Sequence, residues 1–188
     1  YHCASCPVGC GGLSRLPGGG ATHKPEYEPV TALGALLMNE DLDAIFTANE
    51  LLNRAGMDAI SAGGTLAFAI ACYQNGLLTP ADTGGLELAW GNSQSILRLL
   101  EMMIAREGPG ALLADGSLAA ARRIGPGAEK FAMQAGGQEL PMHDGRNDPG
   151  FALHAVVEPT PGRHTLGSYL YYEMFQLWTR VASAPRVR

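Results

Sequence analysis

Three cysteines lie within the first ten residues of this 188-residue chain, and their number and spacing point to a metal site. Cys3, Cys6 and Cys10 are spaced C-x2-C-x3-C among small residues and one proline, so the three thiols can converge on one point. Thiolates select zinc, copper(I) or iron–sulfur clusters, and a zinc site normally shows two separated pairs of Cys or His. A single run of three thiols fits a four-ligand cubane cluster better than half of a zinc site. The residues alone leave a zinc site, or unliganded thiols in a loop, as alternatives.

The fourth cysteine has a different setting. Cys72 stands alone in the apolar stretch "AIACYQNG", which is typical of a buried small hydrophobic residue. Four cysteines with three of them clustered do not form the evenly distributed set of a small secreted disulfide protein. The start of the chain has no n-region, h-region and cleavage site of a signal peptide. The expected location is therefore the cytoplasm.

Composition limits the classes of partner. The chain is 46% hydrophobic with a formal net charge of −5 and a pI near 5.5, which supports a globular protein with one good core or two small ones. Lysines and arginines are scattered and form no basic stripe, so nucleic acid is not an expected partner. The most apolar stretch, residues 59–72, is shorter than the roughly 20 residues that cross a bilayer. No membrane partner is expected either.

Helix signals dominate from residue 41 onward. Asp41 is a plausible N-cap, and the amphipathic run that follows it ends at Gly56, a natural residue for a helix C-terminus. Asp58 or Ser61 can cap a second helix, apolar nearly all round and therefore central and buried. A third helix is expected to stop at a Gly-Pro-Gly sequence. The expected helices span residues 41–56, 58–76, 93–107, 115–124 and 126–135.

The remaining segments predict loops and one terminal helix. Residues 16–29, "LPGGGATHKPEYEP", and residues 136–162 are rich in Gly and Pro and have no period. A last helix is expected from Leu166 to Val181. No segment alternates polar and apolar residues, so the predicted fold is all-α and multihelical. The predicted organisation is a cysteine segment with a loop at 1–40, a helical domain at 41–135, and a loop region with a terminal helix packing on it at 136–188.

Longer stretches resemble the aldehyde ferredoxin oxidoreductase family. They are "CASCPVGC", "KPEYEPVTALGALLMNEDLDAIFTANELLNRAGMDAISAGGTLAFAIACYQNGLL" and "GLELAWGNSQSILRLLEMMIAREGPGALLADG", and they agree with the family in order and roughly in spacing. The resemblance extends over essentially the whole chain. It implies the middle of such an enzyme, with helical domains that follow an N-terminal domain missing here. In the family, that domain cradles a tungsten- or molybdenum-bis-pterin.

The resemblance also implies roles for individual residues. Cys3, Cys6 and Cys10 would be three ligands of a [4Fe–4S] cluster that passes electrons between the pterin and ferredoxin. The fourth ligand is expected beyond the C-terminus of this chain. Glu28 would be an acid or base beside the metal, because oxidising an aldehyde to an acid moves a proton with the electrons. His164, in "PGRHTLG", would hydrogen-bond the substrate oxygen or relay a proton.

A pterin-contacting loop is expected at "NRAGMD", which resembles the family motif D-x-x-G-L-D. Gly56 and Asp58 match the motif, Met57 stands for Leu, and Asn53 replaces the first Asp, which changes the charge facing the pterin amines. The Glu-x-x-His motif that bridges subunits in some family members does not occur. A metal-bridged dimer is therefore not expected.

Two classes of function follow from the sequence. The first is a portion of an aldehyde:ferredoxin oxidoreductase-like enzyme that acts on a small aldehyde and is inactive by itself. The second is a noncatalytic helical module whose thiols hold structural zinc or dock a partner, or an inactive fragment. Iron with acid-labile sulfide in the purified protein would support the first class, whereas stoichiometric zinc without sulfide would support the noncatalytic module.

Overall fold

The structure is a computed structural model that describes residues 1–2, 4–5, 9–16, 18–146 and 149–160. The chain divides into two units, Tyr1–Glu139 and Leu140–Arg188, each of which is described by itself. The elements of the first unit are, in chain order, β1 (Leu13–Arg15), β2 (Ala21–His23), α1 (Tyr27–Leu33), a 3-10 turn η1 (Ala35–Leu37), α2 (Leu42–Ala55), α3 (Ala59–Gln74), α4 (Ser93–Ala105), α5 (Pro109–Leu113), α6 (Ser117–Ile124), a 3-10 turn η2 (Glu129–Phe131), β3 (Gln134–Ala135) and β4 (Gln138–Glu139). The described part of the second unit contains α7 (Pro149–Val157).

Helix α2 begins and ends where its capping residues predict. The Asp41 carboxylate accepts a hydrogen bond from the Ala44 amide at 3.1 Å, so a donor in the first turn has a partner. At the other end Gly56 adopts a left-handed backbone with φ +67°, and the Met57 amide donates to the Leu52 carbonyl at 3.0 Å. This is a glycine-terminated helix end of the Schellman type. The prediction for this helix is confirmed.

Helix α3 is the centre of the first unit. Its N-cap is Asp58, whose carboxylate accepts from the Ser61 amide at 2.7 Å. The helix is apolar on all sides because other helices surround it, and Leu66, Phe68 and Ile70 are almost completely buried. Full burial of each such side chain contributes about 1.5–3 kcal/mol. The expectation of a central buried helix is confirmed.

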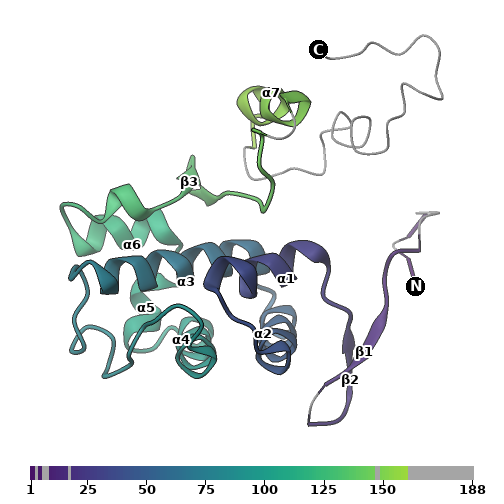
Figure 1. The fold of residues 1–188 in the computed structure, drawn as a ribbon, viewed down its shortest axis with the longest axis horizontal. Coiled ribbons are helices and arrows are strands. Elements are labelled where there is room, and N and C mark those ends of the chain that lie inside the picture. The colour runs from purple at the N-terminus through teal and green to yellow at the C-terminus, as the bar shows by residue number, and fades with distance from the viewer. Residues whose placement is uncertain (3, 6–8, 17, 147–148, 161–188) are drawn as a thin grey trace. The chain divides into compact units, whose positions relative to one another are not determined.

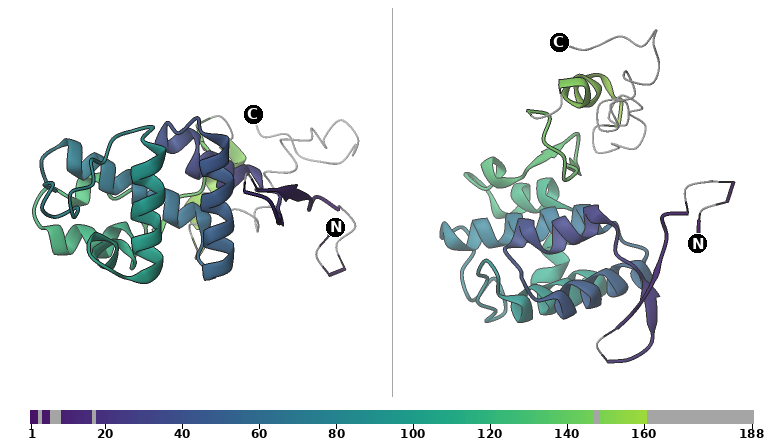
Figure 2. Two further views of the ribbon diagram at one scale, coloured as in Figure 1. Left: turned by 90° about the horizontal axis from the view of Figure 1, so that it is seen from below. Right: turned by 45° about the vertical axis from the view of Figure 1, so that its right-hand side comes forward.

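The helices cross in two layers. In Figure 1, α3 runs across the picture with α1 beside it, while α2 and α4 lie below and are seen nearly end-on. The left view of Figure 2 shows α2 and α4 side by side. The axes of α2 and α3 differ by 119° at the short break between them. The core lies where the layers meet and includes Leu37, Leu52, Leu99 and Leu100, which are 0% exposed.

Helices α4 and α5 make a close backbone contact. A Cβ on Gly110 would lie 2.0 Å from the Met102 carbonyl carbon, so only glycine permits this approach. The predicted stop at Gly-Pro-Gly is only half right, since α4 ends at Ala105 with Arg106 as its C-cap, and Pro109 opens α5. Asp115, after α5, forms ion pairs with Arg106 and Arg123 at 2.8 and 3.1 Å. The Arg106 hydrogen bond is the main reason why the pKa of Asp115 is below its ordinary range.

Several elements correct the sequence prediction. The loop predicted at 16–29 instead contains β2 and the start of α1, and β1 pairs antiparallel with β2. The helix predicted at 126–135 is wrong: Gly127 has φ +93°, and one 3-10 turn is followed by β3. The region predicted to be irregular, 136–162, contains β4 and α7. The multihelical prediction is therefore confirmed, whereas a strictly all-α fold is not.

The second unit is described from residue 140 to residue 160, apart from 147 and 148. Within it, the His143 ring lies against Phe151 with the centroids 4.9 Å apart, and the His154 ring lies 6.0 Å from the same phenyl ring. The helix predicted from Leu166 to Val181 lies outside the described residues.

No single helix among the described residues is long and apolar enough to cross a membrane. Helices α2 and α3 pass such a test of length and composition only when taken together, across their 119° bend.

Gly63 lies where the backbones of α1 and α3 are in close contact, and its replacement tests this contact. A Cβ at Gly63 would lie 2.6 Å from the Ala32 carbonyl oxygen and 2.8 Å from the Ala32 Cβ. We expect Gly63→Ala to lower the free energy of unfolding by about 1–3 kcal/mol, because the two backbones must move apart. The midpoint of urea unfolding measures the loss. Gly18→Ala is the control, since no atom lies within 4 Å of that Cβ; equal midpoints for the two variants would contradict the prediction.

Candidate functional site

The cysteine segment is closed at its base. The Tyr1 nitrogen donates to the Gly11 carbonyl at 3.1 Å, and the Gly11 amide donates back to the Tyr1 carbonyl at 3.0 Å. Cys10 lies next to this pair, exposed and with a free thiol. Cys3 and Cys6 lie outside the described residues.

The hairpin that follows the cysteine segment is fastened to α2. Thr22, on β2, is 3% exposed, and its hydroxyl donates to the Glu50 carboxylate. Arg54, one turn further along α2, forms an ion pair with the same carboxylate at 2.5 Å. The Thr22 hydrogen bond, followed by the Arg54 hydrogen bond, keeps the pKa of Glu50 below its ordinary value. These contacts position the start of the chain beside the helical body.

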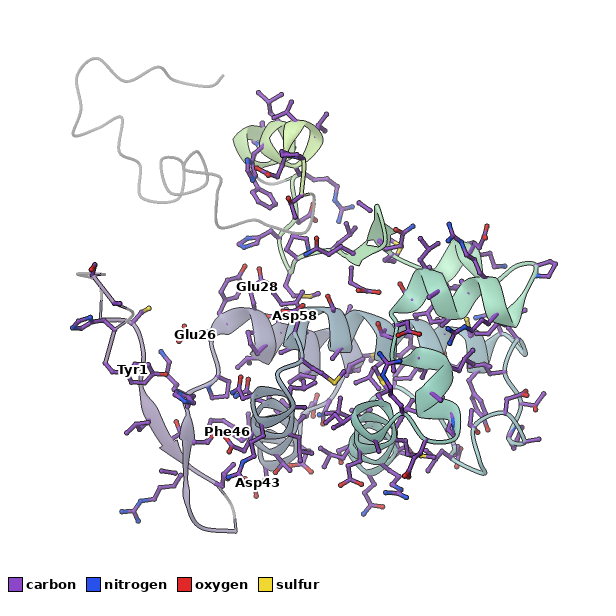
Figure 3. The ribbon with its side chains drawn as sticks, turned by 180° about the vertical axis from the view of Figure 1, so that it is seen from behind. Tyr1, Glu26, Glu28, Asp43, Phe46 and Asp58 are labelled. Atoms are coloured by element: carbon purple, nitrogen blue, oxygen red, sulfur yellow. The ribbon has the colours of Figure 1, made fainter. Side chains whose placement is uncertain are left out.

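The two glutamates of "PEYE" have opposite environments. Glu28 lies in the first turn of α1 and is 5% exposed, and the Tyr27 hydroxyl donates to its Oε1 at 3.1 Å. The Glu26 side chain is 55% exposed. Figure 3 shows Glu28 along the same edge of the α1–α3 layer as Asp58, and Glu26 on the side of the hairpin. The helix therefore selects Glu28 as the carboxylate that can work away from bulk water.

The three residues predicted to contact the pterin form the corner between α2 and α3. Gly56 ends α2, and its amide and that of Met57 donate to the last carbonyls of α2. The Asp58 carboxylate caps α3. Asn53, in the last turn of α2, is exposed, as are Gly56 and Asp58. No atom lies within 4 Å of the position that a Cβ on Gly56 would take, so the corner is open to a ligand.

A cavity of about 310 Å³ opens beside this corner. Met57 and Asp58 form part of its wall, together with Ser61 and Thr65 of α3 and Glu139 of β4. The cavity therefore joins the predicted cofactor loop to residues much later in the chain. Among the described residues, no group of three or more His, Cys, Asp or Glu side chains could hold a metal ion. The described wall of this cavity combines polar side chains with apolar ones such as Met57 and Leu113.

Glu139 is a site residue that sequence reasoning missed. It is 5% exposed, and its Oε1 accepts from the Ser117 amide at 2.7 Å, from the Ser117 hydroxyl at 2.8 Å and from the Thr65 hydroxyl at 3.3 Å. The carboxylate thus caps α6, where it complements the helix dipole, and ties α6 to α3. The available sequence signal was the Gly136-Gly137 pair, which is typical of a two-residue hairpin turn leading into this glutamate.

The remaining predicted residues have separate settings. His164 lies outside the described residues. Cys72 is 0% exposed within α3, and burial raises the pKa of its thiol to about 11, so the prediction of a buried small hydrophobic residue is confirmed. The structure therefore places Asn53, Gly56 and Asp58 together at the α2–α3 corner, with Glu28 in the first turn of α1. Cys10 lies at the start of the hairpin segment, before β1.

The chain is similar to known proteins along most of its length. The family model "Aldehyde ferredoxin oxidoreductase, domains 2 & 3" matches residues 1–185. The tungsten-containing aldehyde ferredoxin oxidoreductases of Pyrococcus furiosus and Pyrococcus abyssi are 39% and 40% identical over 163 and 165 residues, which are 86% of this chain. The WOR-like subunit of the Pyrococcus furiosus aliphatic sulfonate oxidoreductase is 31% identical over 170 residues. This chain spans 27% of the length of each of these relatives.

A solved structure has the same architecture. The active site complex BamBC of benzoyl coenzyme A reductase, in complex with 1,5-dienoyl-CoA, matches with a TM-score of 0.69 and 28% identity over 85% of this chain and 24% of the other. The curated relatives are oxidoreductases, and the family match covers nearly every residue. The chain therefore belongs to the aldehyde ferredoxin oxidoreductase family.

Proposed function

We propose that this chain is the cluster-binding and substrate-facing portion of an oxidoreductase that converts an aldehyde to a carboxylic acid and passes the electrons to ferredoxin. The observation that carries the proposal is the match to domains 2 and 3 of the family over residues 1–185, with the three cysteines at its beginning. The tungsten-containing relatives at 39–40% identity favour an aldehyde over the substrates named for the relatives at 31% and 28%.

The reaction defines what the protein must supply. An aldehyde and one water give a carboxylic acid, two protons and two electrons, and the electrons leave one at a time to two molecules of ferredoxin. A tungsten- or molybdenum-bis-pterin, when bound, supplies the two-electron redox chemistry. The residues of this chain must hold a cluster for single electrons, accept a proton and keep the substrate in place.

Cys3, Cys6 and Cys10 supply thiolates for a [4Fe–4S] cluster. The two hydrogen bonds between Tyr1 and Gly11 support this assignment, because they hold the chain in place directly after Cys10. A fourth ligand has to come from outside the set, since Cys72 is buried within α3 and its thiol has a raised pKa. The donor set is the one that iron–sulfur clusters prefer.

Glu28 accepts a proton that the oxidation releases. Its burial and its hydrogen bond from the Tyr27 hydroxyl support this role, because the carboxylate is held in one orientation away from bulk water. His164, as a second candidate, would hydrogen-bond the substrate oxygen. Both assignments rest on the family resemblance together with the position of Glu28.

The α2–α3 corner contacts the pterin. The exposed Asn53 amide offers a donor and an acceptor, and the open space at Gly56 lets a flat ring approach the backbone. The carboxylate of Asp58 is already the cap of α3, so its contribution is to fix the corner rather than to neutralise a charge.

Metal analysis of the full-length protein tests the proposal. We expect near-equal iron and acid-labile sulfide after anaerobic reconstitution, and Cys10→Ser to lose most of both, because one thiolate ligand is removed. Cys72→Ala is the matched control and should keep the wild-type iron content, since that thiol lies within the core. Reduction of ferredoxin that depends on an added aldehyde is the accompanying activity.

Two results would contradict it. Stoichiometric zinc without sulfide would favour a noncatalytic module with a structural metal site. An iron content that is unchanged in Cys10→Ser would show that Cys10 is not a ligand of the cluster.

A further inference from the structure

The strand that follows the hairpin turn reaches back to the cysteine loop. The Lys24 ammonium, one residue beyond β2, donates a hydrogen bond to the Cys10 carbonyl at 2.9 Å. The Lys24 amide donates to the Gly12 carbonyl, also at 2.9 Å. One residue therefore holds the main chain of Cys10 and of Gly12 at once.

The two glycines after Cys10 are shaped for this contact. A Cβ on Gly12 would lie 3.2 Å from the Lys24 Cβ and 3.3 Å from its Cδ, so the lysine stem lies directly over the glycine. A Cβ on Gly11 would lie 2.5 Å from the Tyr1 ring. The two glycines of "CGG" thus leave room for the Tyr1 ring over Gly11 and for the Lys24 side chain over Gly12. The methylene groups of Lys24 pack on Gly12, while its ammonium donates to the Cys10 carbonyl.

A second residue of the same strand braces the other side of the loop. The Tyr1 hydroxyl and His23 Nδ1 are hydrogen-bonded at 2.5 Å, and their rings meet edge to face with the centroids 5.4 Å apart. His23 and Lys24 are consecutive, so the end of β2 contacts both arms of the loop that Tyr1 and Gly11 close. This arrangement fixes where the Lys24 charge lies relative to Cys10.

The charge of Lys24 is only weakly compensated. Its carboxylate partner, Glu26, is 3.9 Å away, and the two side chains are 47% and 55% exposed. An exposed pair of this length has little interaction energy. The Lys24 ammonium lies 2.9 Å from the Cys10 carbonyl oxygen. This distance is well below the Debye length of roughly 10 Å at 0.1 M salt, so salt does not screen the charge of Lys24 at Cys10.

We propose that Lys24 is a positioning residue of the cluster, which fixes the Cys10 backbone and raises the reduction potential with its positive charge; this rests on the proposed function. A cluster held by thiolates carries negative charge, and reduction by one electron adds another. A cation nearby stabilises the reduced form more than the oxidised form, so it raises the potential. The hydrogen bond to the Cys10 carbonyl limits the motion of a ligand and slows loss of the metal.

The experiment measures the midpoint potential of the cluster in the full-length protein by a redox titration followed by electron paramagnetic resonance. Lys24→Met should lower the potential and accelerate the loss of iron to a chelator by about tenfold. Lys24→Arg, which keeps the charge and a donor, should restore both values toward wild type. Glu26→Gln should shift the potential in the opposite direction, upward, because it removes a negative charge from the same side of the cysteine segment.

Lys130→Met is the matched control. It removes the same charge from an exposed lysine in η2, whose ammonium lies 4.8 Å from the Phe131 ring centroid. This turn follows α6, and α6 lies at the opposite end of the first unit from β1 and β2 (Figure 1). An unchanged potential in Lys24→Met, or the same shift in Lys130→Met, would overturn the proposal. Lys24→Met could bind no iron, and the other two variants then decide. Retention of iron by Lys24→Arg together with an upward shift of the potential in Glu26→Gln would support the proposal. An unshifted potential in Glu26→Gln would overturn the proposal. A wild-type protein without iron and sulfide would instead refute the proposed function.

Discussion

Replacing Glu28 by Gln is expected to lower the turnover of an aldehyde by the full-length enzyme by about 10²-fold or more. The amide keeps the shape of the carboxylate and still accepts a hydrogen bond from the Tyr27 hydroxyl, but it cannot take up a proton. Because the change removes a proton acceptor and not a ligand, the contents of iron and of tungsten or molybdenum should not change. Steady-state kinetics with metal analysis on the same preparation measures both.

Glu26→Gln is the control for this variant. It makes the same chemical change two residues earlier, at a side chain that is 55% exposed, and it should leave turnover within about twofold, the usual small effect of a surface substitution. A rate within a few-fold of wild type in Glu28→Gln would exclude Glu28 from the proton transfer. A loss of metal in the same variant would assign the residue to cofactor retention instead.

Removing the Glu139 carboxylate is expected to have the largest effect on stability. Glu139→Ala leaves the Ser117 amide, the Ser117 hydroxyl and the Thr65 hydroxyl without their acceptor, in a buried setting. Each unsatisfied buried donor costs roughly 1–3 kcal/mol. Water can replace part of the acceptor beside the cavity, so we expect the opening free energy of α6 to fall by about 3 kcal/mol or more. Hydrogen exchange of peptides that cover α6 and β4 measures this opening.

Two further variants separate the carboxylate from its surroundings. Glu139→Gln retains an oxygen acceptor and should lose about 1 kcal/mol. Glu129→Ala, an exposed glutamate in η2, should leave exchange of α6 unchanged. Equal protection of α6 in wild type and Glu139→Ala would show that the helix needs no cap from β4.

The long helices could be predicted because their signals are local. Asp41, Gly56 and Asp58 act within one turn of the helix that they begin or end, so the capping rules apply without any knowledge of the fold. The apolar periodicity of α2 and the uniform apolarity of α3 likewise follow from burial alone. These elements hold the predicted corner, and its position on the helical body follows from them.

Short elements were missed because their partners define them. Strands of two or three residues cannot display a period, and each exists only through pairing with its neighbour. The start of helix α1 was predicted as loop because residues 16–29 are rich in Gly and Pro. However, Pro29 is the third residue of the helix, where a missing amide hydrogen leaves no hydrogen bond unmade. Pro149 similarly begins α7.

Only those parts of the site that lie in a family motif could be predicted from the sequence. Glu28 and the corner at Gly56 are found by motif, but the difference in burial between Glu26 and Glu28 depends on the phase of a helix that was not predicted. The Gly136-Gly137 pair signals a turn before Glu139, but the hydrogen bond of this residue with Thr65 could not be predicted, because the two are 74 residues apart. Lys24 was passed over because its hydrogen bond runs to a backbone atom, which no side-chain pattern reveals.

The burial of Cys72 makes the chemical behaviour of the thiols unequal. With a pKa of about 11, only about one molecule in 10⁴ carries the thiolate at neutral pH, and the surrounding helices exclude reagents. Alkylation of the native protein by iodoacetamide therefore reaches the exposed Cys10 and not Cys72. Protection of Cys10 on metal binding can be followed without interference from the core, and modification of Cys72 reports global unfolding of the first unit.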